Sequence, residues 1–325
     1  MKNFDIICIG ESLRDIFYFI DEASVSCSIE KDRCLLCLEY AEKIPVRSVI
    51  KVPAAGNSAN AAVSSSRLGL KSALVSWVGQ DFVGDQLKNH LREQKVDVSL
   101  LCKCQKQQTS EATLLSYKGE RTQLLFFKPR FYKLPKLQKT NWIYYSAMGN
   151  KFEKFDKELV KYLNDNKKIK FSFQPGTTHV RKGLKHLKPL IKRSDVFILN
   201  KDEAQHILDG NIRPIKNLLE DFHKLGANIV VITDGKQGAY ANEGKNFWHM
   251  PIFKGDAKER TGAGDAFAAA FTVAIMQNKK IPEALRWGTA NSWSVVREVG
   301  PQKGLLTKSQ MQTILKRFKT KANQI

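Results

Sequence analysis

Late in the chain, a short glycine-rich segment precedes an acidic residue and an apolar run. The segment reads Gly262-Ala263-Gly264-Asp265, and residues 266–276 have the length and alanine content of a buried helix. The first amide groups of such a helix lack intrahelical partners, so with the helix dipole they form a site for phosphate oxygens. Asp265 would lie in the first turn, where the dipole favours its ionised form and a substrate hydroxyl could give it a proton. A tight turn capped by an aspartate explains the same residues, so the segment alone leaves both interpretations open.

The surrounding sequence predicts a sheet that would position this helix. Short apolar runs alternate with helical segments between residues 142 and 233, which is typical of a parallel sheet covered by helices. Residues 4–9 form a similar apolar run and predict a buried first strand. Asp15 follows that strand, close to the edge at which open α/β sheets bind their ligands.

Two stretches break the alternation. Residues 17–53 mix short β-like runs with a cysteine-rich segment, and residues 105–130 contain a predicted β-hairpin. We expect these two stretches to form a small separate sheet. The α/β core would then consist of residues 1–16, 54–104 and 131–325.

The composition indicates a soluble enzyme with an unusually basic surface. Charged residues make up 26% and hydrophobic residues 42%, but 53 Lys and Arg against 32 Asp and Glu give a net charge of +21. Such a charge suits an anionic substrate, nucleic acid or an acidic membrane surface. The lysines are spread along the chain, which favours a solvated surface that attracts ATP over nucleic-acid binding. The amino-terminal residues lack a secretory pattern and no apolar run reaches membrane-spanning length, so we expect a cytoplasmic protein.

The cysteines allow two interpretations. Cys34 and Cys37 have the spacing of metal ligands, and Cys27 is a candidate third ligand of a structural zinc ion. The simpler interpretation is that all six cysteines are reduced thiols, because a chain without a secretory signal is not expected to form disulfides.

Two motifs taken together resemble those of the ribokinase-like, or PfkB, carbohydrate kinase family. One is the segment 262–265, and the other begins at Gly56 and continues through Asn60, Gly69 and Gly79. The resemblance extends from about residue 4 to residue 306, and the absence of a GxxxxGK[ST] phosphate loop is in keeping with this family. It implies a three-layer ribokinase-like α/β fold, with a mostly parallel central sheet flanked by helices and a small β-sheet lid.

The resemblance also implies catalytic and substrate-binding roles. Asp265 would be the base that activates the substrate hydroxyl. The anion hole around the transferring group would come from the backbone of Gly262, Ala263 and Gly264. Carboxylate and amide groups can hold a vicinal diol through paired acceptors and donors. The residues implied to bind the sugar in this way are Asp15, Gly56, Asn57 and Asn60.

A further match implies a metal site. Asn200 and Glu203 correspond to the Asn-x-x-Glu pair with which the family holds hydrated magnesium, an ion that keeps several waters and needs few carboxylates. An N-capped helix after a strand is the alternative explanation of the pair.

Two other matches imply nucleotide contacts. Thr233, Gly235 and Gly238 resemble the family's turn against the nucleotide phosphates, although a glycine-rich β-turn explains them equally well. Asn291 resembles the asparagine beside the adenine, and a polar helix position is the alternative.

The chain departs from the family pattern at a few positions. Glu259 and Arg260 stand where the family usually has Asp-Thr, which leaves the presence of a monovalent cation near the glycines open. Ser58 stands where the family prefers Gly, Ala or Pro, and Gln174 lies where a family strand often ends in Asp-Pro.

Together these observations predict an ATP- and Mg²⁺-dependent kinase. We expect it to transfer the γ-phosphoryl group of ATP to a hydroxymethyl group of a small, ribose- or fructose-like sugar, beneath a lid that excludes water. The resemblance implies a homodimer formed through the lid. A nucleoside kinase is an alternative, because nucleosides present the same ribose diol. A non-catalytic binding or regulatory protein on a kinase scaffold is the alternative of a different class.

Overall fold

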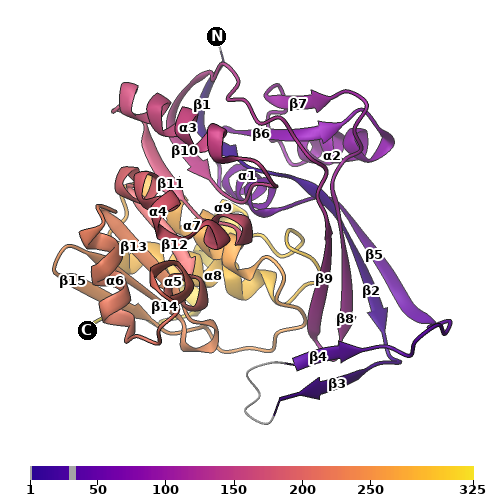
Figure 1. Cartoon of the computed structure of the whole chain (residues 1–325). Helices are drawn as coiled ribbons and strands as arrows, with labels where there is room; N and C mark the ends of the chain where they lie inside the picture. The colour runs from indigo at the N-terminus through magenta and orange to yellow at the C-terminus, as the bar shows by residue number, and fades with distance from the viewer. Residues whose placement is uncertain (1, 29–33) are drawn as a thin grey trace.

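A large parallel sheet forms the centre of the molecule (Figure 1). The computed structural model describes residues 2–28 and 34–325. Seven neighbouring strands of the sheet pair in parallel, as the alternation of strands and helices in the sequence predicted. In spatial order the parallel strands are β7 (Leu101–Cys104), β6 (Ser72–Gly79), β1 (Asn3–Ile9), β10 (Lys139–Tyr145), β11 (Lys170–Phe173), β12 (Val196–Asn200) and β13 (Ile229–Thr233).

Antiparallel strands extend this sheet beyond β13. They are β14 (Ala239–Glu243), β15 (Asn246–Met250) and the short β16 (Asn323–Gln324), which complete a ten-stranded sheet. The sequence did not predict them, because their alternating polar residues lack the continuous apolar runs of the buried parallel strands.

Helices cover both faces of the sheet and make the predicted three layers. In β1, Ile6 and Cys8 belong to one hydrophobic cluster, whereas Ile7 and Ile9 belong to another, because successive strand side chains point to opposite faces. None of the helices in the described residues is long and apolar enough to span a membrane. The first cluster includes α1 (Asn57–Arg67), α2 (Phe82–Glu93), α7 (Ala263–Met276), α8 (Ile281–Val295) and α9 (Lys308–Arg317). The second includes α3 (Glu153–Asp165), α4 (Thr177–Arg193), α5 (Lys201–Leu208) and α6 (Ile215–Lys224).

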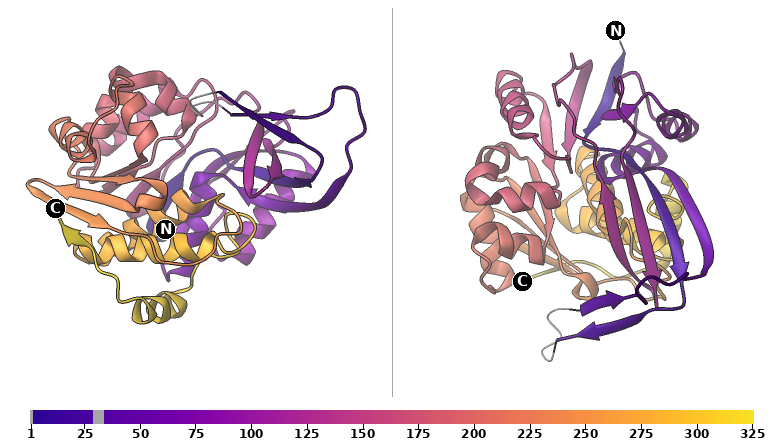
Figure 2. Two further views of the ribbon diagram at one scale, coloured as in Figure 1. Left: turned by 90° about the horizontal axis from the view of Figure 1, so that it is seen from below. Right: turned by 45° about the vertical axis from the view of Figure 1, so that its right-hand side comes forward.

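A small second sheet stands beside the core (Figures 1 and 2). Its four strands lie in the order β5 (Val46–Ala55), β2 (Leu13–Ile20), β8 (Glu111–Tyr117) and β9 (Glu120–Phe126). The predicted hairpin is thus present as β8 and β9. Strands β2 and β5 cross the borders at residues 16/17 and 53/54 that the sequence predicted, so the sheet is continuous with the core segments on either side.

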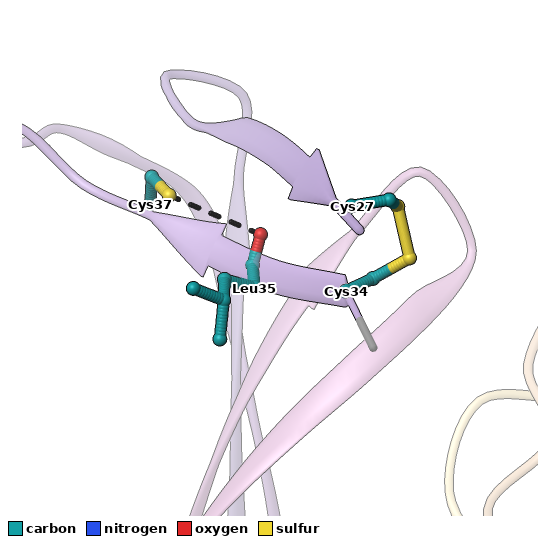
Figure 3. The surroundings of a disulfide bond; sticks show 4 residues. All are labelled: Cys27, Cys34, Leu35 and Cys37. Carbon is teal, nitrogen blue, oxygen red and sulfur yellow. Dashed lines mark hydrogen bonds between the residues drawn. A yellow bond between two sulfur atoms is a disulfide. The ribbon is translucent and has the colours of Figure 1, made fainter. Parts of the chain in front are cut away.

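An additional hairpin, formed by β3 (Ser24–Cys27) and β4 (Cys34–Cys37), lies across the far end of the small sheet. Its antiparallel register sets Cys27 directly opposite Cys34, and the two form a disulfide (Figure 3). The expectation that all cysteines are reduced thiols is therefore wrong for this pair. The sequence offered no sign of this register, since cysteine spacing alone does not show which residues a hairpin brings together.

The structure does not support the predicted zinc site at Cys27, Cys34 and Cys37. Two of these three sulfurs are joined to each other, which leaves only Cys37 with a free thiol. Within residues 2–28 and 34–325, no group of three or more His, Cys, Asp or Glu side chains could hold a metal ion by itself.

The disulfide predicts how the cysteines react. In protein purified without a reductant, alkylation after denaturation is expected to modify Cys8, Cys37, Cys102 and Cys104 only. Peptide mapping by mass spectrometry should find Cys27 linked to Cys34. In Cys27→Ser the released Cys34 thiol should also react, and labelling of every cysteine in the unreduced wild-type protein would rule the disulfide out.

Candidate active site

A cavity of about 590 Å³ lies between the inner face of the small sheet and the core. Its core wall is formed where the parallel strands end, because Glu11, Gln174, Asn200 and Thr233 all line it and follow or terminate β1, β11, β12 and β13. This is the edge at which open α/β sheets bind ligands. A larger hollow of about 880 Å³ lies between α8 and α9, but none of the predicted site residues lines it.

The predicted base is at this cavity, in the first turn of α7. Asp265 accepts a hydrogen bond from the Asn60 side-chain amide through Oδ2 (2.8 Å) and another from the Gln174 side-chain amide through Oδ1 (3.1 Å). The hydroxyl of Tyr144 donates to the Gln174 carbonyl oxygen, which leaves the amide NH₂ directed at Asp265. The carboxylate is thus held by donors from α1 and from the segment after β11.

The segment before α7 requires glycine. Gly262 is the N-cap residue and has a φ of 79°, in the left-handed region that side chains disfavour. A Cβ atom there would lie 2.4 Å from the Cβ of Pro301. Gly262, Gly264 and Asp265 all line the cavity, so the bare backbone faces the space in which a phosphoryl group would sit.

Burial governs the protonation of the two carboxylates at this end of the cavity. Burial raises the pKa of Asp265, and the hydrogen bonds from Asn60 and Gln174 only partly oppose it. Desolvation therefore acts against the expectation that the helix dipole keeps this group ionised. Burial, followed by the negative charges of Asp265 and Glu259, raises the pKa of Asp15 to about 7.

The predicted sugar-binding residues lie together with Asp265. Asp15 on β2 is 4% exposed, and the cavity lining also includes Gly56, Asn57 and Asn60. The side-chain oxygen of Asn60 accepts a hydrogen bond from Gln302 (2.9 Å), which fixes the amide orientation toward Asp265. Four residues from β2 and the start of α1 thus line one end of the cavity with the candidate base.

Asn200 and Glu203 line the cavity and also form a capping box. The Asn200 side chain accepts from the Glu203 backbone amide (2.8 Å), and the Glu203 carboxylate accepts from the Asn200 backbone amide (2.9 Å). The contacts between Asn200 and Glu203 are therefore those of an N-capped helix, the alternative explanation of this pair. Burial raises the pKa of Glu203 to about 7, so a nearby cation would favour its ionised form. One carboxylate and one amide oxygen suit a magnesium ion that keeps most of its waters.

The predicted nucleotide-binding residues are not all at the cavity. Thr233 lines it, whereas Gly235 and Gly238 lie in the turn between β13 and β14, outside the lining. Asn291 is fully buried in α8. Its NH₂ donates to the carbonyl of Ala266 (2.8 Å) and to Ser64, while its oxygen accepts from the backbone amide of Leu306.

Asn291 therefore joins α8 to α1 and α7 and does not contact the cavity. Both ends of its amide are occupied by these buried groups, which is the reason it is not available to a nucleotide in this structure.

Several residues at the site are not among those that the sequence predicted to react or to bind a ligand. Gln174 is recognisable afterwards, because it follows a buried strand at the ligand-binding edge. Glu11 lies in a buried network, where Tyr132 donates to its Oε2 (2.8 Å) and Ser110 to its Oε1 (3.0 Å). Arg121 lies in β9 and lines the cavity from the lid side, which only the alternation along the strand could have indicated.

Glu259 and Arg260, which depart from the family pattern just before the glycines, both contact residues of β9. Glu259 is 3% exposed, accepts from the Thr261 backbone amide (2.7 Å) and lies 3.7 Å from an Arg121 nitrogen. Arg260 forms a 2.7 Å ion pair with Glu120. The segment that precedes Asp265 is therefore linked to the small sheet by two charge pairs.

Comparisons with known proteins agree with this geometry. The family described as pfkB family carbohydrate kinase matches residues 18–308. An ATP-dependent 6-phosphofructokinase of Thermoanaerobacterium thermosaccharolyticum is 24% identical over 92% of this chain and 90% of its own length. A nucleoside kinase of Methanocaldococcus jannaschii is 26% identical over 86% of this chain and 94% of its own.

Solved structures show the same fold. Ribokinase of Arabidopsis thaliana, solved with ribose and ATP, superimposes with a TM-score of 0.78 at 18% identity and covers 97% of this chain and 99% of its own. The predicted ribokinase-like fold is confirmed. With the family match over residues 18–308, the chain belongs to the pfkB family of carbohydrate kinases, phosphotransferases with an alcohol group as acceptor.

Proposed function

We propose that this chain transfers the γ-phosphoryl group of ATP to a hydroxymethyl group of a small sugar. The observation that carries the proposal is the placement of Asp265, held by Asn60 and Gln174 at the cavity beside the bare backbone of residues 262–264. A sugar is favoured over a nucleoside because Asp15, Asn57 and Asn60 supply acceptors and donors for hydroxyls, whereas Phe127 is the only aromatic side chain in the described cavity lining.

The geometry supports a direct transfer. The hydroxymethyl oxygen attacks the γ-phosphorus, its proton passes to Asp265, and the bond from phosphorus to the leaving ADP oxygen breaks. The raised pKa of Asp265 makes it a stronger base than an exposed carboxylate. The backbone amides at the start of α7 stabilise the negative charge that the transferring group carries.

We assign nucleotide and metal contacts to the part of the cavity wall formed by the ends of β12 and β13. Thr233 would contact the ATP phosphates, and Asn200 with Glu203 would hold magnesium through its waters. When bound, the ion would offset phosphate charge. Gly235 and Gly238 would shape the turn that follows β13 without reaching the cavity themselves.

We also propose that residues 17–53 and 105–130 act as a lid on the core. The inner face of the small sheet supplies one wall of the cavity, through side chains of β2, β8 and β9. Such a wall limits access of water to the transferring phosphoryl group, which would otherwise be lost to hydrolysis.

Replacing the base tests the proposed function. Asp265→Asn keeps the shape of the side chain but removes proton acceptance, so kcat for the best acceptor in a sugar and nucleoside panel should fall about 10²- to 10⁴-fold in a coupled ADP-release assay. Asp85→Asn is the matched control, because Asp85 also lies in the first turn of a helix but is exposed and away from the cavity. Undiminished turnover in Asp265→Asn, or saturation by nucleosides alone, would contradict the proposal.

The raised pKa values predict the pH dependence. Because Asp265 must be ionised to accept a proton and burial raises its pKa, kcat/KM should begin to fall at a higher pH than an exposed aspartate would cause. Asp15, whose pKa burial raises to about 7, should take up a proton in the same acid limb. In Asp15→Asn the loss of a neighbouring negative charge should move the acid limb to lower pH. Activity that is constant down to pH 5 would show that neither carboxylate has a raised pKa.

The outer face of the lid supports a homodimer. Along β9, Leu124 faces away from the cavity and is 55% exposed, and Val49 on β5 is 44% exposed. On the same face Tyr18 pairs with Val49 and with Leu115. Leu115 faces Thr122, and Leu124 lies two residues farther along β9, so the apolar stripe runs diagonally across the four strands. An uncovered stripe of this kind is typical of a surface that pairs with a second copy.

Charge placed on this stripe should separate the copies. Wild-type protein is expected to sediment as a dimer in analytical ultracentrifugation, and Leu124→Glu as a monomer, because a carboxylate would be buried without a partner. Phe82→Glu, which changes an exposed apolar residue on the core surface, should remain dimeric. A monomeric wild-type protein would refute the dimer.

A further inference from the structure

The inner face of the lid carries one guanidinium group among uncharged neighbours on β9. Side chains at positions 121, 123 and 125 point to the same side of the strand and line the cavity as Arg121, Gln123 and Leu125. The register with β8 places Arg121 opposite Ser116 and Gln123 opposite the fully buried Leu114. The same register sets Asp15 level with Ala112 and Leu125, so the long Arg121 side chain, whose Nη1 lies 3.7 Å from Glu259 Oε1, carries its charge along the strand toward the segment that holds Asp265.

Arg121 has no hydrogen-bond acceptor among residues 2–28 and 34–325. The carboxylate nearest to it is Glu259, whose Oε1 lies 3.7 Å from the Arg121 Nη1 atom and already accepts from Thr261. Arg260, by contrast, is paired with Glu120 at 2.7 Å. The Arg121 side chain is only 28% exposed, so water can reach only part of a group that carries five donors.

The charge of Arg121 is felt by the catalytic end of the cavity. It lowers the pKa of both Asp15 and Asp265, opposing the effect of their burial. Hydroxyl groups of a neutral sugar need both acceptors and donors, which Asp15, Asn57 and Asn60 already provide. A guanidinium accepts no hydrogen bond, and its planar fork matches the paired oxygens of a carboxylate or a phosphate.

We propose that the acceptor sugar carries an anionic group, a carboxylate or a phosphate, which Arg121 binds from the lid with Gln123 beside it. The inference rests on the proposed kinase function and specifies its substrate class. It also gives the lid a part in selection, because with a neutral sugar the guanidinium would keep only its 3.7 Å contact with Glu259 and would lack a hydrogen-bond acceptor. An anionic sugar would supply the acceptor that the protein lacks and would draw β9 onto the substrate.

Three acceptors that share a ketohexose skeleton and differ in the groups at its two ends provide the test. Fructose is neutral, 2-ketogluconate has a carboxylate in place of one hydroxymethyl group, and fructose 6-phosphate has a phosphate at the other. Wild-type enzyme with ATP should show a kcat/KM at least about 10-fold higher for one of the two anions than for fructose. The preferred anion tells whether the carboxylate or the phosphate fits.

Substitution of the guanidinium should remove this preference. Arg121→Gln is expected to lower the ratio of anion to fructose kcat/KM by about 10- to 100-fold, chiefly through KM for the anion. Arg121→Lys, which keeps the charge but loses the fork, should retain an intermediate ratio and controls for misfolding. Lys103→Gln removes the same charge from the exposed part of β7 and should keep the wild-type ratio.

A binding readout separates this inference from the proposed function. The preferred anion should raise the melting temperature of the wild-type protein more than fructose does, and this difference should vanish in Arg121→Gln. If it does so while no acceptor is phosphorylated, the kinase proposal fails and the anion site stands. Equal use of fructose and both anions overturns the inference. The inference is also overturned if Arg121→Gln lowers kcat by the same factor for every acceptor, because Arg121 would then act on the transferring phosphoryl group.

Discussion

The buried carboxylate of Asp265 is the constraint on which the rest of the site depends. Removing a carboxylate from water is costly unless hydrogen bonds and nearby charges compensate, and here burial is the largest effect on its pKa. Two side-chain amides compensate, and they come from α1 and from the end of β11. Helix α1 and the end of β11 must therefore hold fixed positions relative to α7 for the Asp265 carboxylate to be stabilised.

The interior polar contacts meet this requirement. Gln302 donates to the backbone of Ala54 (2.7 Å) and to Asn60 (2.9 Å), which links a late loop to the start of α1. Asn291 connects α8 to α7 and to Leu306 in the segment before α9. Around them α7 is apolar on nearly every side, so it can only be accommodated in the interior. Apolar contacts alone do not fix how the packed helices and loops are oriented, whereas the directional hydrogen bonds of these two amides do.

The sequence predicted what depends on neighbours along the chain. The apolar runs predicted the parallel strands, and the glycines before an alanine-rich run predicted the start of α7 with Asp265 in its first turn. It could not show that Asn60 and Gln174 donate to the same carboxylate, because the fold alone brings together residues so distant in sequence. For Asn291 the sequence predicted a ligand contact that the structure does not have. A polar residue on a helix gives the same sequence pattern whether it binds a ligand or an interior carbonyl.

Two of the residues at which this chain departs from the family pattern, Glu259 and Arg260, are understood only together with the lid. Glu259 is a buried carboxylate, and the guanidinium of Arg121 is the positive charge nearest to it. The exposed pair between Arg260 and Glu120 contributes about 0–1 kcal/mol at most, so the Glu259 contact is the one that matters energetically. Yet the same guanidinium also faces the cavity.

If an anionic substrate draws Arg121 into a tighter contact, the Glu259 carboxylate loses part of its compensation at the moment the substrate is bound. The segment that carries Asp265 is then sensitive to what occupies the lid. On this proposal, substrate choice and placement of the base are coupled through one shared positive charge.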